Sequence, residues 1–164
     1  MKISPLIKGI ITAVAMLAVI LYTFYYAPKN NFLPKIVFAL YAAGIFWAII
    51  DYSRTPAYQG KFGELFGQGF RCFIIVALFM AIFNFAFISA NPEFKERDGE
   101  TYRKFLTEQK DRSRTNDEIE KEVQRYKKTY IAQNLSFTTF SYLVQGVMYS
   151  AAGAGLILLL RRRN

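Results

Sequence analysis

The sequence contains no histidine and a single cysteine, Cys72, among its 164 residues. Without histidine, the chain lacks the usual general base at neutral pH and the commonest metal-binding side chain. One cysteine forms neither an intrachain disulfide nor a cysteine-only zinc site. No glycine-rich segment has the spacing and strand context of a dinucleotide fingerprint. We therefore expect a non-enzymatic protein with no catalytic residues, no metal site and no cofactor.

Charge is absent from four long blocks, although charged residues make up 20% of the chain. These blocks are residues 9–27, 36–50, 72–89 and 136–160. The first is apolar on every face of a helix, and so short a chain has too little other material to shield four such segments from water. We expect four transmembrane helices in their place. The expected spans are about residues 9–27, 33–52, 70–90 and 137–160.

The loop between the third and fourth spans, residues 91–135, is highly charged. It holds eleven Lys and Arg against ten Asp and Glu, so its net charge is only +1. Thr115 and Glu118 form a capping-box pattern for a helix start. A weaker helix is expected over residues 101–109. One helical stripe follows the capping box, formed by Ile119, Val123, Tyr126 and Tyr130. The loop is therefore predicted to be an amphipathic helical hairpin, inserted into an all-α membrane bundle that forms a single domain over residues 1–164.

The number and the position of the basic residues both bear on the orientation of the chain in the membrane. Four spans put both termini and the second connection on one side, with seven Lys and Arg against two acidic residues. The other side has thirteen basic and ten acidic residues, so a literal positive-inside count places it in the cytoplasm. However, the basic residues of the long loop alternate with acids and lie mostly far from the span ends. We therefore expect cytoplasmic N- and C-termini.

Charged residues beside the spans are candidates for contact with a partner or with lipid. Basic groups at this position face anionic headgroups rather than nucleic acid, so no nucleic-acid partner is expected. Glu64 and Arg71 lie seven residues apart on one helical face, with Gly67 and Gly69 between them. The simpler interpretation, an anchoring arginine with an interfacial acid, is the one we favour. The candidate lipid or partner contacts are Glu64, Arg71, Arg161, Arg162 and Arg163.

Small and uncharged polar residues within the spans predict helix packing. Gly146, Ser150 and Ala154 recur at intervals of four, which lets helix backbones approach closely in lipid. We favour packing within one chain over homodimerisation. Asn84 and Gln145 are expected to hydrogen-bond each other, or a backbone group, across helices. None of the polar residues in the spans is ionisable, which argues against a proton-coupled transporter.

Four segments of the chain are similar to one bacterial family. They read KISPLIKGIITAVAM, FGELFGQGFR, NPEFKE and NDEIEKEVQRYKKTY. In these segments the chain resembles the family called domain of unknown function 4199, found in Bacteroidetes. The resemblance implies a four-helix protein of the inner membrane with a charged loop between the third and fourth helices. It implies no activity and no site residues.

Two functional hypotheses follow. The first is a non-enzymatic scaffold or accessory subunit of a membrane complex, whose charged loop contacts a partner protein or the membrane surface. The alternative is a small transporter or lipid-handling subunit that works as a homo-oligomer, which the small-residue faces and Arg71 favour. A membrane-embedded enzyme ranks third, because the sequence lacks acid–base groups in its spans.

Overall fold

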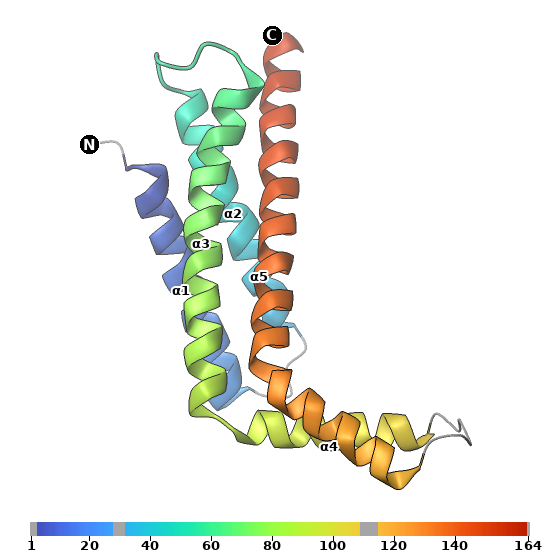
Figure 1. Ribbon diagram of the computed structural model, residues 1–164. Helices are drawn as coiled ribbons and strands as arrows, with labels where there is room; N and C mark the ends of the chain where they lie inside the picture. The colour runs from blue at the N-terminus through green and yellow to red at the C-terminus, as the bar shows by residue number, and fades with distance from the viewer. Residues whose placement is uncertain (1–2, 28–31, 109–114, 164) are drawn as a thin grey trace. The chain divides into compact units, whose positions relative to one another are not determined.

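The structure, a computed structural model, describes residues 3–27, 32–108 and 115–163. Within these residues all regular secondary structure is helical, which confirms the predicted all-α class. Figure 1 shows the helices in order along the chain. They are α1 (Pro5–Tyr26), α2 (Leu33–Ser53), α3 (Phe62–Ala90), α4 (Glu93–Glu108) and α5 (Asn116–Arg163).

Local sequence signals explain where two of the helices begin. The Ser4 hydroxyl accepts a hydrogen bond from the Ile7 amide at 3.3 Å, and Pro5 occupies the first helical turn of α1. At the start of α5, the Thr115 hydroxyl accepts from the Glu118 amide at 3.4 Å. The Glu118 carboxylate accepts in return from the Thr115 amide at 2.8 Å. This reciprocal pair confirms the predicted capping box.

The chain divides into two compact units. One, here called the bundle unit, comprises residues 1–80 and 139–164. The other, the hairpin unit, comprises residues 81–138. The helices α3 and α5 each contribute one segment to both units, and each unit is described by itself below.

In the bundle unit, α1, α2 and the adjoining segments of α3 and α5 lie side by side (Figure 1). Glycine allows the closest approaches between them. A Cβ atom at Gly44 would lie 2.1 Å from the Thr12 hydroxyl, and one at Gly9 would lie 2.7 Å from the Cys72 carbonyl oxygen. Close backbone contact of this kind is how helices associate where hydrocarbon replaces water. The core includes Met16, Tyr41, Ile45, Ile49, Leu65, Phe73 and Val76.

Large apolar side chains also cover the outside of the bundle unit. Leu6, Val14, Leu78, Met148 and Leu159 are all exposed. Water solvates such a surface poorly, whereas lipid tails solvate it well. At 1.5 Å per residue, the 22 residues of α1 span about 33 Å, close to the ~30 Å hydrocarbon thickness of a bilayer. Among the described residues, four segments are long and apolar enough to cross a membrane: Pro5–Tyr26, Lys35–Ser53, Phe62–Ala90 and Asn116–Arg161.

The helix α3 begins at Phe62, eight residues before the expected start of the third span at residue 70. The three glycines in this segment each disfavour a helix by about 1 kcal/mol. Packing offsets that cost, because Leu65 is fully buried and the rings of Phe62 and Phe66 stack with centroids 5.9 Å apart. Glu64 in the first turn also complements the helix dipole.

The charged loop is more helical than expected. The helix α4 covers Glu93–Glu108 rather than residues 101–109, and Gln109 lies outside the described residues. The helix α5 runs without a break from the loop into the expected fourth span. Residues 131–136 at that junction contain neither glycine nor proline, so no local signal ends the helix there.

Candidate functional site

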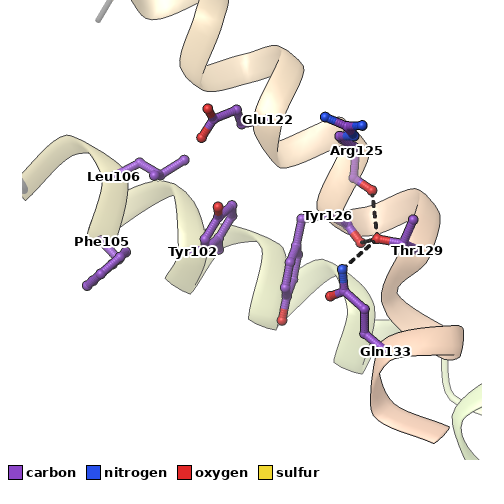
Figure 2. A pocket seen from close by; sticks show the side chains of 8 residues that line it. All are labelled: Tyr102, Phe105, Leu106, Glu122, Arg125, Tyr126, Thr129 and Gln133. Atoms are coloured by element: carbon purple, nitrogen blue, oxygen red, sulfur yellow. Dashed lines mark hydrogen bonds between the residues drawn. The ribbon is translucent and has the colours of Figure 1, made fainter. Parts of the chain in front are cut away.

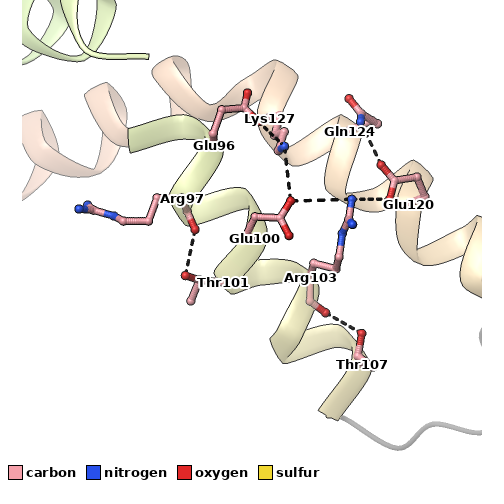
Figure 3. Close-up of polar contacts among 9 residues, drawn as sticks. All are labelled: Glu96, Arg97, Glu100, Thr101, Arg103, Thr107, Glu120, Gln124 and Lys127. Carbon is pink, nitrogen blue, oxygen red and sulfur yellow. Dashed lines mark hydrogen bonds and ion pairs between the residues drawn. The ribbon is translucent and has the colours of Figure 1, made fainter. Parts of the chain in front are cut away.

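A network of ion pairs joins α4 to the first part of α5 in the hairpin unit (Figure 3). Arg103 pairs with Glu120 at 2.6 Å, and Lys127 pairs with Glu96 at 2.5 Å. Glu100 lies between the two cations, 3.9 Å from each. Exposed pairs of this kind contribute little individually, so their main effect is to align the two helices.

Lys127 is the most buried member of this network. Its side chain is only 12% exposed, and it lies along α4 at Gly99, where a Cβ atom would come within 2.3 Å of the lysine Cε. Its hydrogen bond and its positive charge, with help from the charge of Lys95, hold the pKa of the Glu96 carboxyl below the usual range. The Lys127 ammonium group is therefore fixed in position by its neighbours.

Tyr130 makes the deepest polar contact of the hairpin unit. The residue is 3% exposed, and its hydroxyl donates a hydrogen bond of 2.6 Å to the Asp98 carboxylate. Burial raises the pKa of the Tyr130 phenol, and so do the hydrogen bond to Asp98 and its negative charge. The folded chain therefore favours the neutral phenol.

This raised pKa predicts a dependence of stability on alkaline pH. The free energy contributed by the neutral Tyr130 is complete below the ordinary tyrosine pKa of about 10 and is lost as pH rises above it. We expect Tyr130→Phe to unfold more easily than the wild type at pH 8, by about 1 kcal/mol, since one hydrogen bond is lost. The two unfolding curves should converge between pH 10 and 12. Denaturant unfolding in detergent would measure this, and a constant gap across that range would contradict it.

Aromatic side chains line a groove of about 530 Å³ between α4 and α5 (Figure 2). The rings of Tyr102 and Tyr126 stack with centroids 4.7 Å apart, and Leu106 is buried beside them. Phe105 is 52% exposed. The groove is lined by Tyr102, Phe105, Leu106, Glu122, Arg125, Tyr126, Thr129 and Gln133.

The groove combines an apolar floor with a polar rim. Glu122 and Arg125 supply charges of both signs, and the Gln133 amide donates to the Thr129 hydroxyl at 2.9 Å. Aromatic residues surrounded by a polar edge are typical of surfaces that bind other proteins. Among the residues that the structure describes, no group of three or more Cys, Asp or Glu side chains is placed to hold a metal ion.

A buried ion pair joins α1 to α2 in the bundle unit. The Lys8 ammonium group donates to the Asp51 carboxylate, and the lysine side chain is only 3% exposed. The same ammonium group lies 5.3 Å from the centre of the Trp47 ring. A cavity of about 180 Å³ next to the pair is also lined by Gln68 and Thr55. This pair is not among the contacts expected from the sequence, because both charges lie outside the uncharged blocks.

The described side chains among the candidate lipid and partner contacts do not form one common site. Glu64 accepts a hydrogen bond from the Gln59 amide at 2.9 Å. The guanidinium of Arg161 lies over the ring of Tyr58, 4.7 Å from its centre. Arg71 is exposed on α3 and forms no ion pair with any described residue, Glu64 included. Arg162 and Arg163 belong to the last turn of α5, and their side chains lie outside the described part of the chain.

Asn84 and Gln145 belong to different units, so a hydrogen bond between them stays a prediction. The Asn84 amide nitrogen is buried and has no hydrogen-bond partner among the described residues. Gln145 is half-buried on α5.

The three small residues of α5 face the other helices of the bundle unit. A Cβ atom at Gly146 would lie 2.5 Å from both the Tyr41 hydroxyl and the Phe73 ring. Ser150 is fully buried against Gly69, where a Cβ atom would approach its hydroxyl to 2.5 Å. Ala154 is also fully buried.

Comparison with known proteins gives one match. Residues 6–159 match a family model described as "Protein of unknown function (DUF4199)". No curated protein and no solved structure shows significant similarity to the chain. Because the match covers nearly the whole chain, from the first turn of α1 almost to the end of α5, this protein belongs to the DUF4199 family.

Proposed function

We propose that this protein is an integral protein of the bacterial inner membrane and serves there as a non-enzymatic scaffold or accessory subunit of a membrane complex. Four long apolar helices and the outward-facing apolar side chains of the bundle unit support the membrane assignment. The aromatic groove of the hairpin unit carries the functional proposal. This groove combines large aromatic side chains with a charged rim.

Both termini are proposed to lie in the cytoplasm. The start of α1 contacts the end of α2 through Lys8 and Asp51, and the end of α5 contacts the α2–α3 connection through Arg161 and Tyr58. The two ends of the chain and this connection therefore share one end of the bundle unit, together with several basic residues. Three spans then separate α4 and the first part of α5 from the N-terminus, which puts these segments outside the cytoplasm.

The groove is proposed to bind an amphipathic helix of a partner protein. An apolar face with side chains at intervals of three and four residues would cover Tyr102, Phe105 and Tyr126. Polar residues beside that face would meet Glu122 and Arg125 at the rim. Exposed aromatic side chains such as Phe105 gain the most from this burial, since aromatic rings dominate binding energy at protein interfaces.

Replacing Phe105 with glutamate tests the groove. The side chain is half-exposed, so the variant should fold, but a charge there should weaken partner binding at least tenfold, equivalent to ~1.4 kcal/mol. The measurement is the yield of site-specific photo-crosslinking from position 133, an exposed position on the groove rim, in native membranes, followed by mass spectrometry. Thr107→Glu is the matched control, because it places the same charge at an exposed position on the same helix.

A single protein that crosslinks from position 133 in the wild type and in Thr107→Glu, and that is lost in Phe105→Glu and in Tyr102→Ala, would support the proposal. Crosslinks to lipid alone would exclude a protein partner at the groove. If deletion of residues 95–130 leaves co-purifying proteins and phenotype unchanged, the scaffold role is wrong.

A second candidate function is that of a small oligomeric transporter or lipid-handling subunit. The observation that favours it is Arg71, an exposed cation that forms no ion pair with a described residue and lies among the exposed apolar residues Phe70, Ile74 and Leu78 of α3. A guanidinium group there is suited to a lipid phosphate or to an acidic residue of another copy. Crosslinks between copies of this chain, instead of to a different protein, would favour this function.

A further inference from the structure

A second cavity of the hairpin unit, of about 330 Å³, is lined by polar side chains. Three of its five lining residues are lysines, which come from both α4 and α5. Lys95 and Glu96 belong to α4, and Gln124, Lys127 and Lys128 belong to α5. This composition differs from that of the aromatic groove, with which the cavity shares no residue.

The cations of this cavity exceed its anions. Lys127 is neutralised by Glu96 at 2.5 Å, with Glu100 at 3.9 Å. Lys95 and Lys128 form no ion pair with any carboxylate of the described residues. The Gln124 amide nitrogen donates to the Glu120 carboxylate at 3.0 Å, so Glu120 is already bonded to Gln124 as well as to Arg103. Neither Lys95 nor Lys128 therefore has a described carboxylate within ion-pair distance, although the charge of Lys95 still acts on Glu96.

Lys127, which also lines this cavity, contacts both helices. Lys127 is held along α4 by its two carboxylates and by the space at Gly99. These contacts hold Lys127 between α4 and α5 at the cavity. Lys95 precedes Glu96 on one helix and Lys128 follows Lys127 on the other, so the Lys127–Glu96 ion pair brings the backbones at Lys95 and Lys128 to the same cavity.

We propose that this cavity binds a phosphate group through the ammonium groups of Lys95 and Lys128. Lysine binds phosphate as a compact point charge with three rotatable donors. The cavity is large enough for a phosphate and its nearest substituent. The same chemistry is offered by a phospholipid headgroup and by a soluble phosphate compound, and the experiment below separates these two sources.

The test uses the full chain in a neutral detergent. Wild type, Lys95→Gln/Lys128→Gln and the control Lys104→Gln/Lys121→Gln are titrated with inorganic phosphate and, separately, with short-chain phosphatidic acid, using calorimetry at low salt. The control removes the same charge from exposed lysines of the same two helices. We expect the site variant to bind about tenfold or more weakly than wild type and the control to bind within about twofold of it.

Each outcome decides the proposal. Binding of both ligands, or of phosphatidic acid alone, with selective loss in the site variant, supports a lipid headgroup. Selective loss with inorganic phosphate alone supports a soluble ligand. Equal weakening in both variants shows a general charge effect and overturns the proposal, as does a wild type that binds neither ligand. Circular dichroism must show equal helix content in all three proteins.

Discussion

Asp51→Asn is expected to lower the free energy of unfolding by about 3 kcal/mol, because it leaves a buried lysine without its counter-charge. Removing one partner of a buried pair costs about 3–5 kcal/mol. The lower end applies here, since the Lys8 side chain is 3% exposed whereas that of Asp51 is 41% exposed. Reversible unfolding in mixed detergent and dodecyl sulfate micelles would measure the change.

Because the two side chains are buried unequally, the two single substitutions should lower the free energy of unfolding by different amounts. Lys8→Met should cost much less, about 1 kcal/mol, because the half-exposed Asp51 carboxylate can be hydrated. The double variant should therefore be more stable than Asp51→Asn alone. Equal losses in the two single variants would mean that Lys8 reaches solvent, and would contradict the burial seen in the structure.

Gly146→Ala is expected to destabilise the bundle unit by about 2 kcal/mol. The added methyl group would meet the Tyr41 hydroxyl and the Phe73 ring at 2.5 Å, well inside van der Waals contact. Tyr41 cannot move away cheaply, because its hydroxyl donates a hydrogen bond of 2.8 Å to the Tyr142 carbonyl. The same unfolding assay would measure the loss.

Gly155→Ala is the matched control on the same helix. A Cβ atom there meets nothing within 4 Å, so the substitution should be neutral or should stabilise α5 by up to about 1 kcal/mol through helix propensity. If the two alanine variants had the same stability, the close packing of α5 at Gly146 would be wrong.

Much of the fold could be predicted from the sequence where the signal is local. The capping box at Thr115 and Glu118 was found from four residues and is confirmed by two hydrogen bonds. The all-α class followed from the uncharged blocks. The expected third span begins at residue 70, and the helical face shared by Glu64 and Arg71 already implies that the helix starts before it. The start at Phe62 itself could not be predicted, because three nearby glycines disfavour a helix and the burial of Leu65 depends on tertiary contacts.

The contacts between distant residues were harder to predict. Lys8 and Asp51 are 43 positions apart, and each taken alone resembles a charge at the membrane edge. A signal was nevertheless present, since Lys8 lies near the start of α1 and Asp51 near the end of α2, and consecutive antiparallel helices place such positions at the same level. The aromatic groove and the lysine cavity depend on how α4 packs against α5. The apolar stripe of one helix does not predict which residues of the other helix it contacts.

The ion pair between consecutive helices also bears on how the chain is made. During synthesis, α1 leaves the ribosome before α2, and the remaining helices follow. Entering a bilayer alone, α1 would carry the Lys8 ammonium group without its carboxylate, whereas α1 and α2 entering together bring both charges. Insertion of the first two helices as a pair would therefore keep the Lys8 charge neutralised.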